Sequence, residues 1–271
     1  MADVITSKSN EKLKLVRRLA QRRHREREGL FVTEGEDLLA AGLAAGVEPV
    51  ALLTLEGEGL GGEEVSADVM ASASTLGSGT RAIAVWRQTW APAVGVLCVY
   101  LHGVSDPGNV GAIVRTAHAL VEGTVVLGPD CADPYGPKAV RATMGSIFDQ
   151  ALSKAGIEDT PRPRVALVAH GGHQIDELAG SCEHVNRTRQ DRPGLHSEAL
   201  STQPRPASSD GLAAGFTICL GAERAGLPAD VLTSCDRQAT IPLRPGGAES
   251  LNVAAAAAIA LQRISSEATG G

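Results

Sequence analysis

The second half of the chain alternates short apolar runs with helix-like segments, and this alternation limits the possible folds more than any other feature. The apolar runs are Val96–Leu101, Thr124–Leu127, Val165–Ala169, Thr217–Leu220 and Ala239–Pro242. Helix-like patterns lie near Val110–Val121, Pro137–Asp149 and Leu251–Ser266. Continuous apolar runs of this length are typical of strands buried on both faces of a parallel sheet. Strands that alternate with helices therefore predict an α/β domain.

A smaller α/β unit is expected before this region. A helix is predicted near 10–24, because Leu13, Val16 and Ala20 recur at helical spacing and Asn10 is a suitable cap. The other expected elements are strands at Leu30–Thr33, Val50–Leu55 and Ala82–Arg87, a loop at Glu56–Glu64 and a helix at Glu36–Ala45 ended by Gly46. A boundary falls near Trp90–Ala93, which predicts one domain over residues 1–91 and a second over 94–271.

One segment of the second domain breaks the alternation. From about Gly180 to Gly215 the sequence is polar and rich in turn residues. A structureless loop of this length is uncommon inside a compact domain. We therefore expect a flexible surface insertion at about 180–215.

Composition excludes several classes of protein. A chain of 271 residues, 43% of them hydrophobic, can form one large or two modest domains. Because only 3% of the residues are aromatic, we expect an aliphatic, alanine-rich core. No run of about 18 apolar residues and no signal-peptide pattern is present, so we expect a cytoplasmic protein without a membrane span. Five scattered cysteines without a Cys-x-x-Cys pair fit free thiols in a reducing compartment. His170-Gly171-Gly172-His173 lacks further ligands, so we expect no metal.

The net charge of −6 hides a basic segment near the start of the chain. Residues 8–27 hold nine basic and two acidic side chains, a local charge of +7. A solvated helix face is the simpler interpretation, but so one-sided a run also fits contact with the phosphates of RNA. The candidate contacts are Arg17, Arg18, Arg22 and Arg23.

Three short stretches carry candidate chemistry. The first is Asp106–Gly111 with Arg115, where Asn109 stands at the start of a helix and Arg115 lies off its buried stripe. The second is Leu220–Leu227, in which Gly221 ends a strand and Glu223 follows. Taken alone, Arg115 is more simply a surface arginine, and Glu223 could equally be a capping acid.

The third stretch is the most specific. Ile241-Pro242-Leu243 is predicted to end an apolar strand, Gly246-Gly247 forms a loop, and Ser250-Leu251-Asn252 opens an alanine-rich helix. Ser250 is the expected cap of that helix. An ordinary amphipathic helix is the simple alternative, but this order of parts suits a loop that binds a small molecule through backbone groups.

In this order and spacing the three stretches resemble the SpoU (TrmH) family of S-adenosylmethionine-dependent RNA ribose 2′-O-methyltransferases, which belongs to the SPOUT superfamily. A fourth stretch supports the resemblance: Asp133-Pro134-Tyr135, Lys138 and Arg141–Phe148, with Thr143 where the family usually has serine. The resemblance covers about residues 94–271, and the insertion departs from it. It implies a parallel-sheet domain with a C-terminal trefoil knot, preceded by a small L30e-like domain that binds the RNA substrate, in a homodimer.

The resemblance also assigns roles to residues. The catalytic residues that it implies are Asn109, Arg115, Glu223, Ser250 and Asn252. The residues that it implies for S-adenosylmethionine are Leu220, Gly221, Ala222, Ile241, Leu243, Ser250 and Leu251, with Gly221 letting the cofactor approach the main chain. Arg141 is implied to meet RNA or the partner subunit. A guanidinium is a poor base, so Arg115 is expected to fix a phosphate and stabilise the developing alkoxide, and the proton acceptor stays open.

Several functions remain compatible with these residues. The first expectation is 2′-O-methylation of ribosomal RNA, because a separate N-terminal domain is present. The alternatives are a transfer-RNA 2′-O-methyltransferase, an RNA-binding or ribosome-assembly protein with weak catalysis, and a knotted enzyme that methylates a base. The intact catalytic set argues against weak catalysis, and Arg115 with Ser250-Leu251-Asn252 favours ribose over base.

Overall fold

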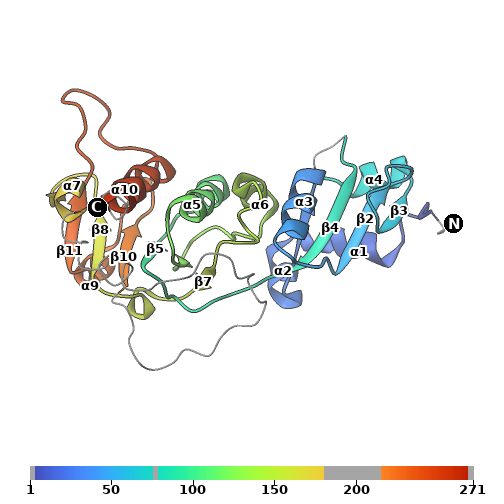
Figure 1. Cartoon of the computed structure of the whole chain (residues 1–271), viewed down its shortest axis with the longest axis horizontal. Coiled ribbons are helices and arrows are strands. Elements are labelled where there is room, and N and C mark those ends of the chain that lie inside the picture. Colours follow the sequence, from blue (N-terminus) through green and yellow to red (C-terminus); the bar gives the residue numbers. More distant parts are fainter. Residues whose placement is uncertain (1–3, 76–78, 180–214, 268–271) are drawn as a thin grey trace, which may run out of the picture. The chain divides into compact units, whose positions relative to one another are not determined.

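The computed structural model describes residues 4–75, 79–179 and 215–267, and Figure 1 shows its helices and strands. The insertion expected at about 180–215 lies outside the described residues, apart from Gly215. The chain forms two compact units. The first contains residues 1–91, 104–118 and 130–151, and the second contains residues 92–103, 119–129 and 152–271.

The first unit is built on a four-stranded sheet in the order β1-β4-β2-β3. Its strands are β1 (Leu30–Glu34), β2 (Ala51–Leu55), β3 (Glu63–Val65) and β4 (Ala82–Arg87). β4 pairs antiparallel with β1 and β2, whereas β3 runs parallel to β2. Helices α3 (Glu36–Ala44) and α4 (Ala67–Ala73) accompany the sheet. The sequence predicted β1, β2, β4 and α3, but not α4. β3 was not predicted either, because it has only three residues and two of them are glutamates.

The helix predicted at 10–24 is two helices, α1 (Glu11–Leu19) and α2 (Arg22–Glu28). The Asn10 side chain accepts a hydrogen bond from the Lys12 amide, as predicted for the cap. The backbone then turns at Gln21, whose φ of −96° and ψ of 132° are extended. Ala20 was predicted to be on the buried stripe, but it is exposed, and Leu19 is the buried residue there. Because of this break, α2 does not continue the helix axis of α1.

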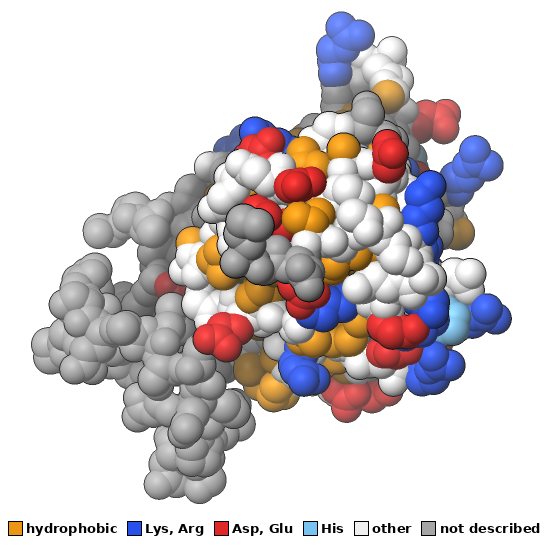
Figure 2. All heavy atoms as spheres, turned by 90° about the vertical axis from the view of Figure 1, so that its right-hand side faces the viewer, with side chains coloured by type: hydrophobic (Ala, Val, Ile, Leu, Met, Phe, Trp, Pro, Cys, Tyr) orange, Lys and Arg blue, Asp and Glu red, His pale blue; other side chains and the backbone are white. Residues whose placement is uncertain are grey.

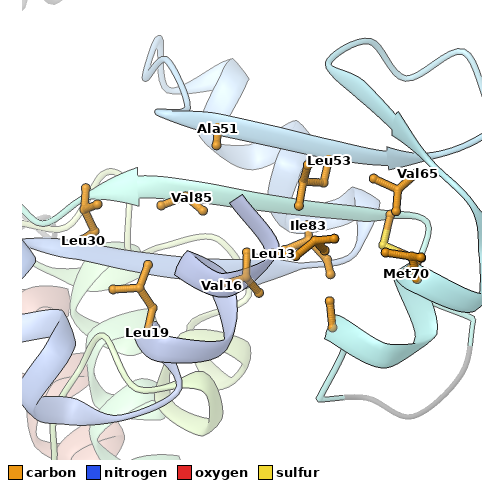
Figure 3. Close-up of a cluster of buried hydrophobic side chains, with 12 residues drawn as sticks. Leu13, Val16, Leu19, Leu30, Ala51, Leu53, Val65, Met70, Ile83 and Val85 are labelled. Carbon is orange, nitrogen blue, oxygen red and sulfur yellow. The ribbon is translucent and has the colours of Figure 1, made fainter. Parts of the chain in front are cut away.

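A core of aliphatic side chains joins α1 to the sheet of this unit. Figure 3 shows Leu13 and Val16 of α1 beside Ile83 of β4, and the remaining labelled side chains come from all four strands, from α1 and from α4. Leu13, Leu53 and Ile83 are completely buried. Each such side chain contributes about 1.5–3 kcal/mol relative to an exposed one, so this cluster fixes α1 on the sheet.

Most aromatic side chains of the chain gather in the same unit. Ring centroids lie 4.8 Å apart for Phe31 and Tyr135, 4.8 Å for Trp86 and Phe148, and 5.3 Å for Trp90 and Tyr135. Tyr135 and Phe148 come from the segment 130–151. The prediction of an aliphatic core therefore holds for the cluster of Figure 3, whereas aromatic rings hold segment 130–151 against β1 and β4.

The second unit is built on a fully parallel sheet, as the sequence predicted. Its order is β7-β6-β5-β10-β8-β11-β9. The strands are β5 (Leu97–Leu101), β6 (Val125–Leu127), β7 (Leu152–Lys154), β8 (Arg164–Leu167), β9 (His173–Gln174), β10 (Phe216–Leu220) and β11 (Arg237–Thr240). Each pair of neighbours is parallel. The carboxyl ends of β10, β8 and β11 thus lie at one edge of the sheet.

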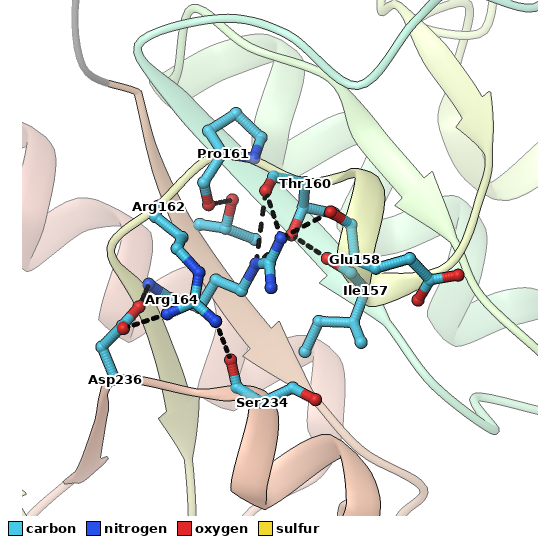
Figure 4. Close-up of polar contacts among 9 residues, drawn as sticks. Ile157, Glu158, Thr160, Pro161, Arg162, Arg164, Ser234 and Asp236 are labelled. Atoms are coloured by element: carbon cyan, nitrogen blue, oxygen red, sulfur yellow. Dashed lines mark hydrogen bonds and ion pairs between the residues drawn. The ribbon is translucent and has the colours of Figure 1, made fainter.

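Polar contacts around the buried Arg164 fix the amino end of β8 (Figure 4). The guanidinium of Arg164 donates to the carbonyl oxygens of Glu158 and Thr160, each at 2.7 Å. The carboxylate of Asp236 accepts from the Arg164 amide at 2.7 Å and also pairs with Arg162. Because Asp236 directly precedes β11, this network sets the start of β8 beside the start of β11.

The first unit also contains α6 (Pro137–Thr143) and most of α5 (Pro107–Leu120). The second unit contains α7 (Ile175–Ala179), α9 (Ala229–Ser234), α10 (Val253–Glu267) and a 3-10 turn, η1, at Ile157–Asp159. α6 is shorter than the predicted Pro137–Asp149, because Met144 and Gly145 have positive φ angles of 49° and 95°. The described helices include none whose length and apolar character would allow it to cross a membrane.

Candidate cofactor and active site

A pocket of about 390 Å³ lies in the second unit, where β8, β10 and β11 end. These strands are neighbours in the sheet, and loops that leave the carboxyl ends of parallel strands commonly form ligand sites. The loop after β8 contributes Val168, Ala169 and His170. The loops after β10 and β11 contribute the remaining walls, together with the first turn of α10.

All seven residues that the family resemblance implies for the cofactor line this pocket. They are Leu220, Gly221, Ala222, Ile241, Leu243, Ser250 and Leu251. Ile241 and Leu243 follow the strand and do not belong to it, because β11 covers Arg237–Thr240 and ends two residues earlier than the predicted strand Ala239–Pro242. The apolar run had suggested a later strand, but pairing with β8 involves the exposed Arg237 and Gln238.

Sequence reasoning missed part of the lining. Val168, Ala169 and His170 follow a predicted strand, so the rule that parallel strands end at the same edge could have placed them here. Arg224 and Glu249 also line the pocket. Both are exposed polar residues in loops, and no periodic pattern marks them.

Gly221 is required by the loop that it opens. A Cβ atom at this position would lie 2.2 Å from the carbonyl carbon of Gly226. The loop closes through reciprocal hydrogen bonds between Ala222 and Gly226, at 3.1 and 2.8 Å. Close packing of the loop on itself therefore explains this glycine, in addition to its position on the pocket wall.

Asn252 links the second and third sequence stretches. Its side-chain nitrogen donates to Glu223 at 2.8 Å, and its side-chain oxygen accepts from the amides of Ala254 and Ala255 at 2.9 and 3.3 Å. Asn252 is thus the cap of α10, and the prediction that Ser250 caps this helix is wrong. Ser250 is exposed and lines the pocket instead.

The first sequence stretch opens α5 and lies within residues 104–118, which belong to the first unit. The carboxylate of Asp106 caps this helix by accepting from the amides of Gly108 and Asn109, at 2.7 and 3.1 Å. Lys138 of α6 donates to the same carboxylate at 2.7 Å. This ammonium, with the helix amides, lowers the pKa of Asp106. Asn109 therefore lies in the first turn of α5, and the exposed Arg115 follows two turns later.

Close packing against α6 fixes the position of α5. A Cβ atom on Gly111 would lie 2.3 Å from the carbonyl oxygen of Ala139 and 2.6 Å from the Cβ of Ala142. The two helix backbones approach each other at this glycine. The structure thus positions Asn109 and Arg115 within the first unit, and it brings Glu223, Ser250 and Asn252 together in the second.

The predicted RNA contacts differ in their surroundings. Arg17 is half-buried and donates to the Lys8 carbonyl and to Ser72. Arg22 pairs with Glu26 at 3.0 Å, and Arg18 lies 4.0 Å from Glu28. The exposed Arg23 has no such partner among the described residues. The basic run is therefore partly neutralised by its own acidic neighbours.

Arg25, which belongs to the same basic run, is not part of a surface. Its side chain is 5% exposed and pairs with Asp133 at 2.7 Å. It also donates to the carbonyl oxygens of Leu19 and Ala20, at 2.7 and 2.8 Å. Arg25 thus closes the end of α1 and connects it to segment 130–151.

The other candidates from the sequence form no metal site within the described ranges, where no three metal-ligating side chains gather. The Nδ1 atom of His173 lies 3.3 Å from Glu177, and His170 lines the pocket. Cys98, Cys131 and Cys219 are buried free thiols, and Cys235 is half-buried. Cys182 lies outside the described residues.

Known proteins resemble the chain over nearly its whole length. The crystal structure of an S-adenosylmethionine-bound rRNA methyltransferase from Sinorhizobium meliloti matches with a TM-score of 0.73 and 25% identity, over 97% of each chain. An uncharacterized tRNA/rRNA methyltransferase of Synechocystis is 30% identical over 95% of this chain and 91% of its own length. RlmP of Bacillus subtilis, a 23S rRNA guanosine 2′-O-methyltransferase, is 27% identical over 96% and 98%.

Two family models also match. An MRM3-like substrate binding domain matches residues 10–87. The model of the SpoU rRNA methylase family matches residues 96–262, which is more than half of the chain. This match and the Synechocystis relative establish the same conclusion: the chain belongs to the SpoU rRNA methylase family.

Proposed function

We propose that the protein transfers the methyl group of S-adenosylmethionine to a ribose 2′-hydroxyl of ribosomal RNA. The observation that carries this proposal is the pocket at the ends of β8, β10 and β11. Its walls contain every residue that the family resemblance assigns to the cofactor. Membership of the SpoU family supports the reaction class.

The chemistry of the pocket fits S-adenosylmethionine. Its volume of about 390 Å³ lies in the usual range for small-molecule pockets. Leu220, Ile241 and Leu243 offer apolar surface to an adenine ring. The carboxylates of Glu223 and Glu249 outnumber the guanidinium of Arg224, which suits a ligand with a sulfonium and an ammonium group. When bound, this cofactor supplies an electrophilic methyl group.

The residues of the chain would then position the ribose and manage its charge. Arg115 would hold the phosphate next to the reacting ribose and stabilise the oxygen as its proton leaves. Asn109 would orient the same nucleotide. The hydrogen bond from Asn252 keeps the Glu223 carboxylate at the pocket wall. Positioning of this kind can supply most of the rate when the leaving group is good.

The proposed substrate is ribosomal RNA, with transfer RNA as the alternative. The relative RlmP is named for 23S rRNA, and the N-terminal match is to a substrate binding domain. The test is to incubate the protein and methyl-labelled S-adenosylmethionine with ribosomal RNA and transfer RNA in separate reactions. Label in ribosomal RNA supports the proposal. Label in transfer RNA alone would overturn the choice of substrate, and cofactor binding without transfer to either RNA would favour a ribosome-assembly protein.

The same proposal includes the organisation of the molecule. Residues 1–91 are the RNA-binding, L30e-like domain, and residues 94–271 are the methyltransferase domain with a C-terminal trefoil knot. The family matches at 10–87 and 96–262 support this division. The protein acts as a homodimer in the cytoplasm and uses no metal. Sedimentation of the purified protein tests the dimer, and activity in the presence of a chelator tests the independence from metal.

A further inference from the structure

The first unit has a pocket of its own, with a volume of about 230 Å³. Its walls come from α1, β1, the first turn of α3, the end of α4 with the residues after it, Tyr135 and α6. It shares no residue with the pocket of the second unit. Two of its lining residues, Arg17 and Arg141, are among the predicted RNA contacts, but no ligand has been assigned to the pocket itself.

Two guanidinium groups line this pocket. Arg17 is held in place, because it donates to the Lys8 carbonyl at 2.7 Å and to the Ser72 hydroxyl at 3.0 Å. Arg141 on α6 is exposed, and its guanidinium makes no hydrogen bond or ion pair with the described residues. A guanidinium presents five donors in a plane that matches phosphate oxygens. The same pocket is therefore lined by the guanidinium of Arg17, which is held in place, and by that of Arg141, which can bind a ligand.

The acidic residue of the lining, Glu34, already accepts hydrogen bonds from other residues of the pocket wall. Glu34 accepts from the Thr75 hydroxyl at 2.6 Å, from the Thr75 amide at 3.0 Å and from the Ser74 hydroxyl at 2.7 Å. These bonds hold the residues after α4 in a defined position. With two guanidiniums and one carboxylate, the formal charge of the lining is +1, which complements a phosphate.

The rest of the lining is suited to a nucleobase. Val16, Val32, Leu38 and Val140 supply apolar surface. The hydroxyls of Ser72 and Ser74 donate to the Val69 carbonyl and to Glu34, so they can offer a base only their acceptor capacity. A base has apolar faces and a polar edge, and this combination meets both. The volume is below the roughly 300–1,000 Å³ that is typical of drug-sized ligands, so it suits a single base.

Basic side chains other than Arg17 continue along α1 and α2. α1 and α2 carry the basic run, and Figure 2 shows Lys and Arg side chains gathered along the right-hand edge of the face in view, near a histidine. Acidic side chains are interspersed among them, in agreement with the ion pairs of Lys14 with Glu11 and Arg22 with Glu26. Phosphates on either side of a bound nucleotide would meet this surface.

We propose that this pocket, defined by Arg17, Ser72, Ser74 and Arg141, binds one unstacked nucleotide of the substrate RNA. The base lies among the apolar side chains, and the neighbouring phosphate lies on the two guanidiniums. Proteins that read RNA usually do so at single-stranded positions whose bases can be splayed out. The inference rests on the proposed function only in taking RNA as the substrate.

The test uses the full-length protein without cofactor. The probe is a short single-stranded RNA that carries one 2-aminopurine, and its affinity is compared with that of the matching duplex. Arg141→Ala is expected to weaken binding of the single strand about tenfold and to reduce the salt slope by about one. The control is Arg87→Ala, which removes another exposed arginine of the same unit outside the pocket and should change affinity by about twofold at most.

Three outcomes would overturn the proposal. Equal losses for the two variants would reduce Arg141 to general surface charge. Equal affinity for duplex and single strand, without a rise in 2-aminopurine fluorescence, would exclude an unstacked base. Adenosine monophosphate binding as tightly as the oligonucleotide would indicate a small-molecule site. Because no methyl transfer is measured, failure of the proposed reaction cannot produce any of these results.

Discussion

Single residues carry the proposed chemistry, and Arg115 gives the sharpest prediction. The Arg115→Ala variant should lose methyl transfer by at least about a hundredfold, because a donor that stabilises developing charge is removed. Its affinity for S-adenosylmethionine should stay unchanged, since Arg115 is not among the lining residues of the cofactor pocket. Arg115 is exposed, so its removal should not disturb folding. Calorimetry of cofactor binding together with a transfer assay checks both parts, and a large loss of cofactor affinity would show that the role is misassigned.

Asn252 allows the structural and active-site roles of one side chain to be separated. Asn252→Ala removes both the cap of α10 and the bond to Glu223, so it should lose about 1 kcal/mol of stability and also lose activity. Asn252→Asp keeps a good capping group but places a second carboxylate beside Glu223. It should retain most of the stability and still lose activity. Thermal unfolding and transfer rates of the two variants decide this, and full activity of the aspartate variant would contradict the role of the Asn252–Glu223 bond.

At the level of elements, the cap of α5 makes stability depend on pH. The pKa of Asp106 is lowered, chiefly by Lys138. The stabilising effect of its charge is therefore complete above the ordinary value of about 3.9 and disappears as the pH falls through the lowered one. Asp106→Ala should cost about 1 kcal/mol at neutral pH, and this difference should shrink in strong acid, where the neutral carboxyl keeps only a weaker acceptor for the helix amides. A difference in unfolding free energy that is as large at low pH as at neutral pH would contradict the role of the charge.

The contact between α5 and α6 makes a second prediction at this level. Gly111→Ala introduces a methyl group 2.3 Å from a backbone oxygen of α6, so it should destabilise the protein by about 1–3 kcal/mol. In a helix without this close contact, replacing Gly by Ala would stabilise the protein by about 1 kcal/mol. The sign of the change in unfolding free energy therefore shows whether the close contact exists. Ala112→Ser, at the neighbouring, partly exposed position, is the control. A stabilised Gly111→Ala variant would show that the helices do not approach as described.

The elements also show what a sequence can and cannot predict. Buried strands such as β5 and β10 were recognisable, because continuous apolar runs report burial on both faces. β11 was shifted, because pairing with β8 and not hydrophobicity fixes its register. The break between α1 and α2 was missed, because the basic residues continue through it without an apolar signal. The cap of α10 was assigned to Ser250 because both Ser250 and Asn252 are good caps, and only the geometry distinguishes them.

At the scale of the whole molecule, the sequence motifs predicted the family and the cofactor, and the parallel sheet predicted where its loops meet. All seven predicted cofactor residues line one pocket, because β8, β10 and β11 end at one edge of the sheet. The membership of residues 104–118 and 130–151 in the first unit was not predictable. It depends on contacts between distant segments, such as the pair of Arg25 with Asp133 and the ring contact of Phe31 with Tyr135, which local patterns do not report.

The proposed reaction places the methyl group on a ribose oxygen, and alkaline hydrolysis of the labelled RNA tests this most directly. A 2′-O-methyl group blocks attack of that oxygen on the adjacent phosphate, whereas a methyl group on a base does not. Ribosomal RNA labelled by the protein with methyl-labelled S-adenosylmethionine should therefore yield its label in alkali-resistant dinucleotides. Label recovered only in mononucleotides would contradict the account and assign the methyl group to a base.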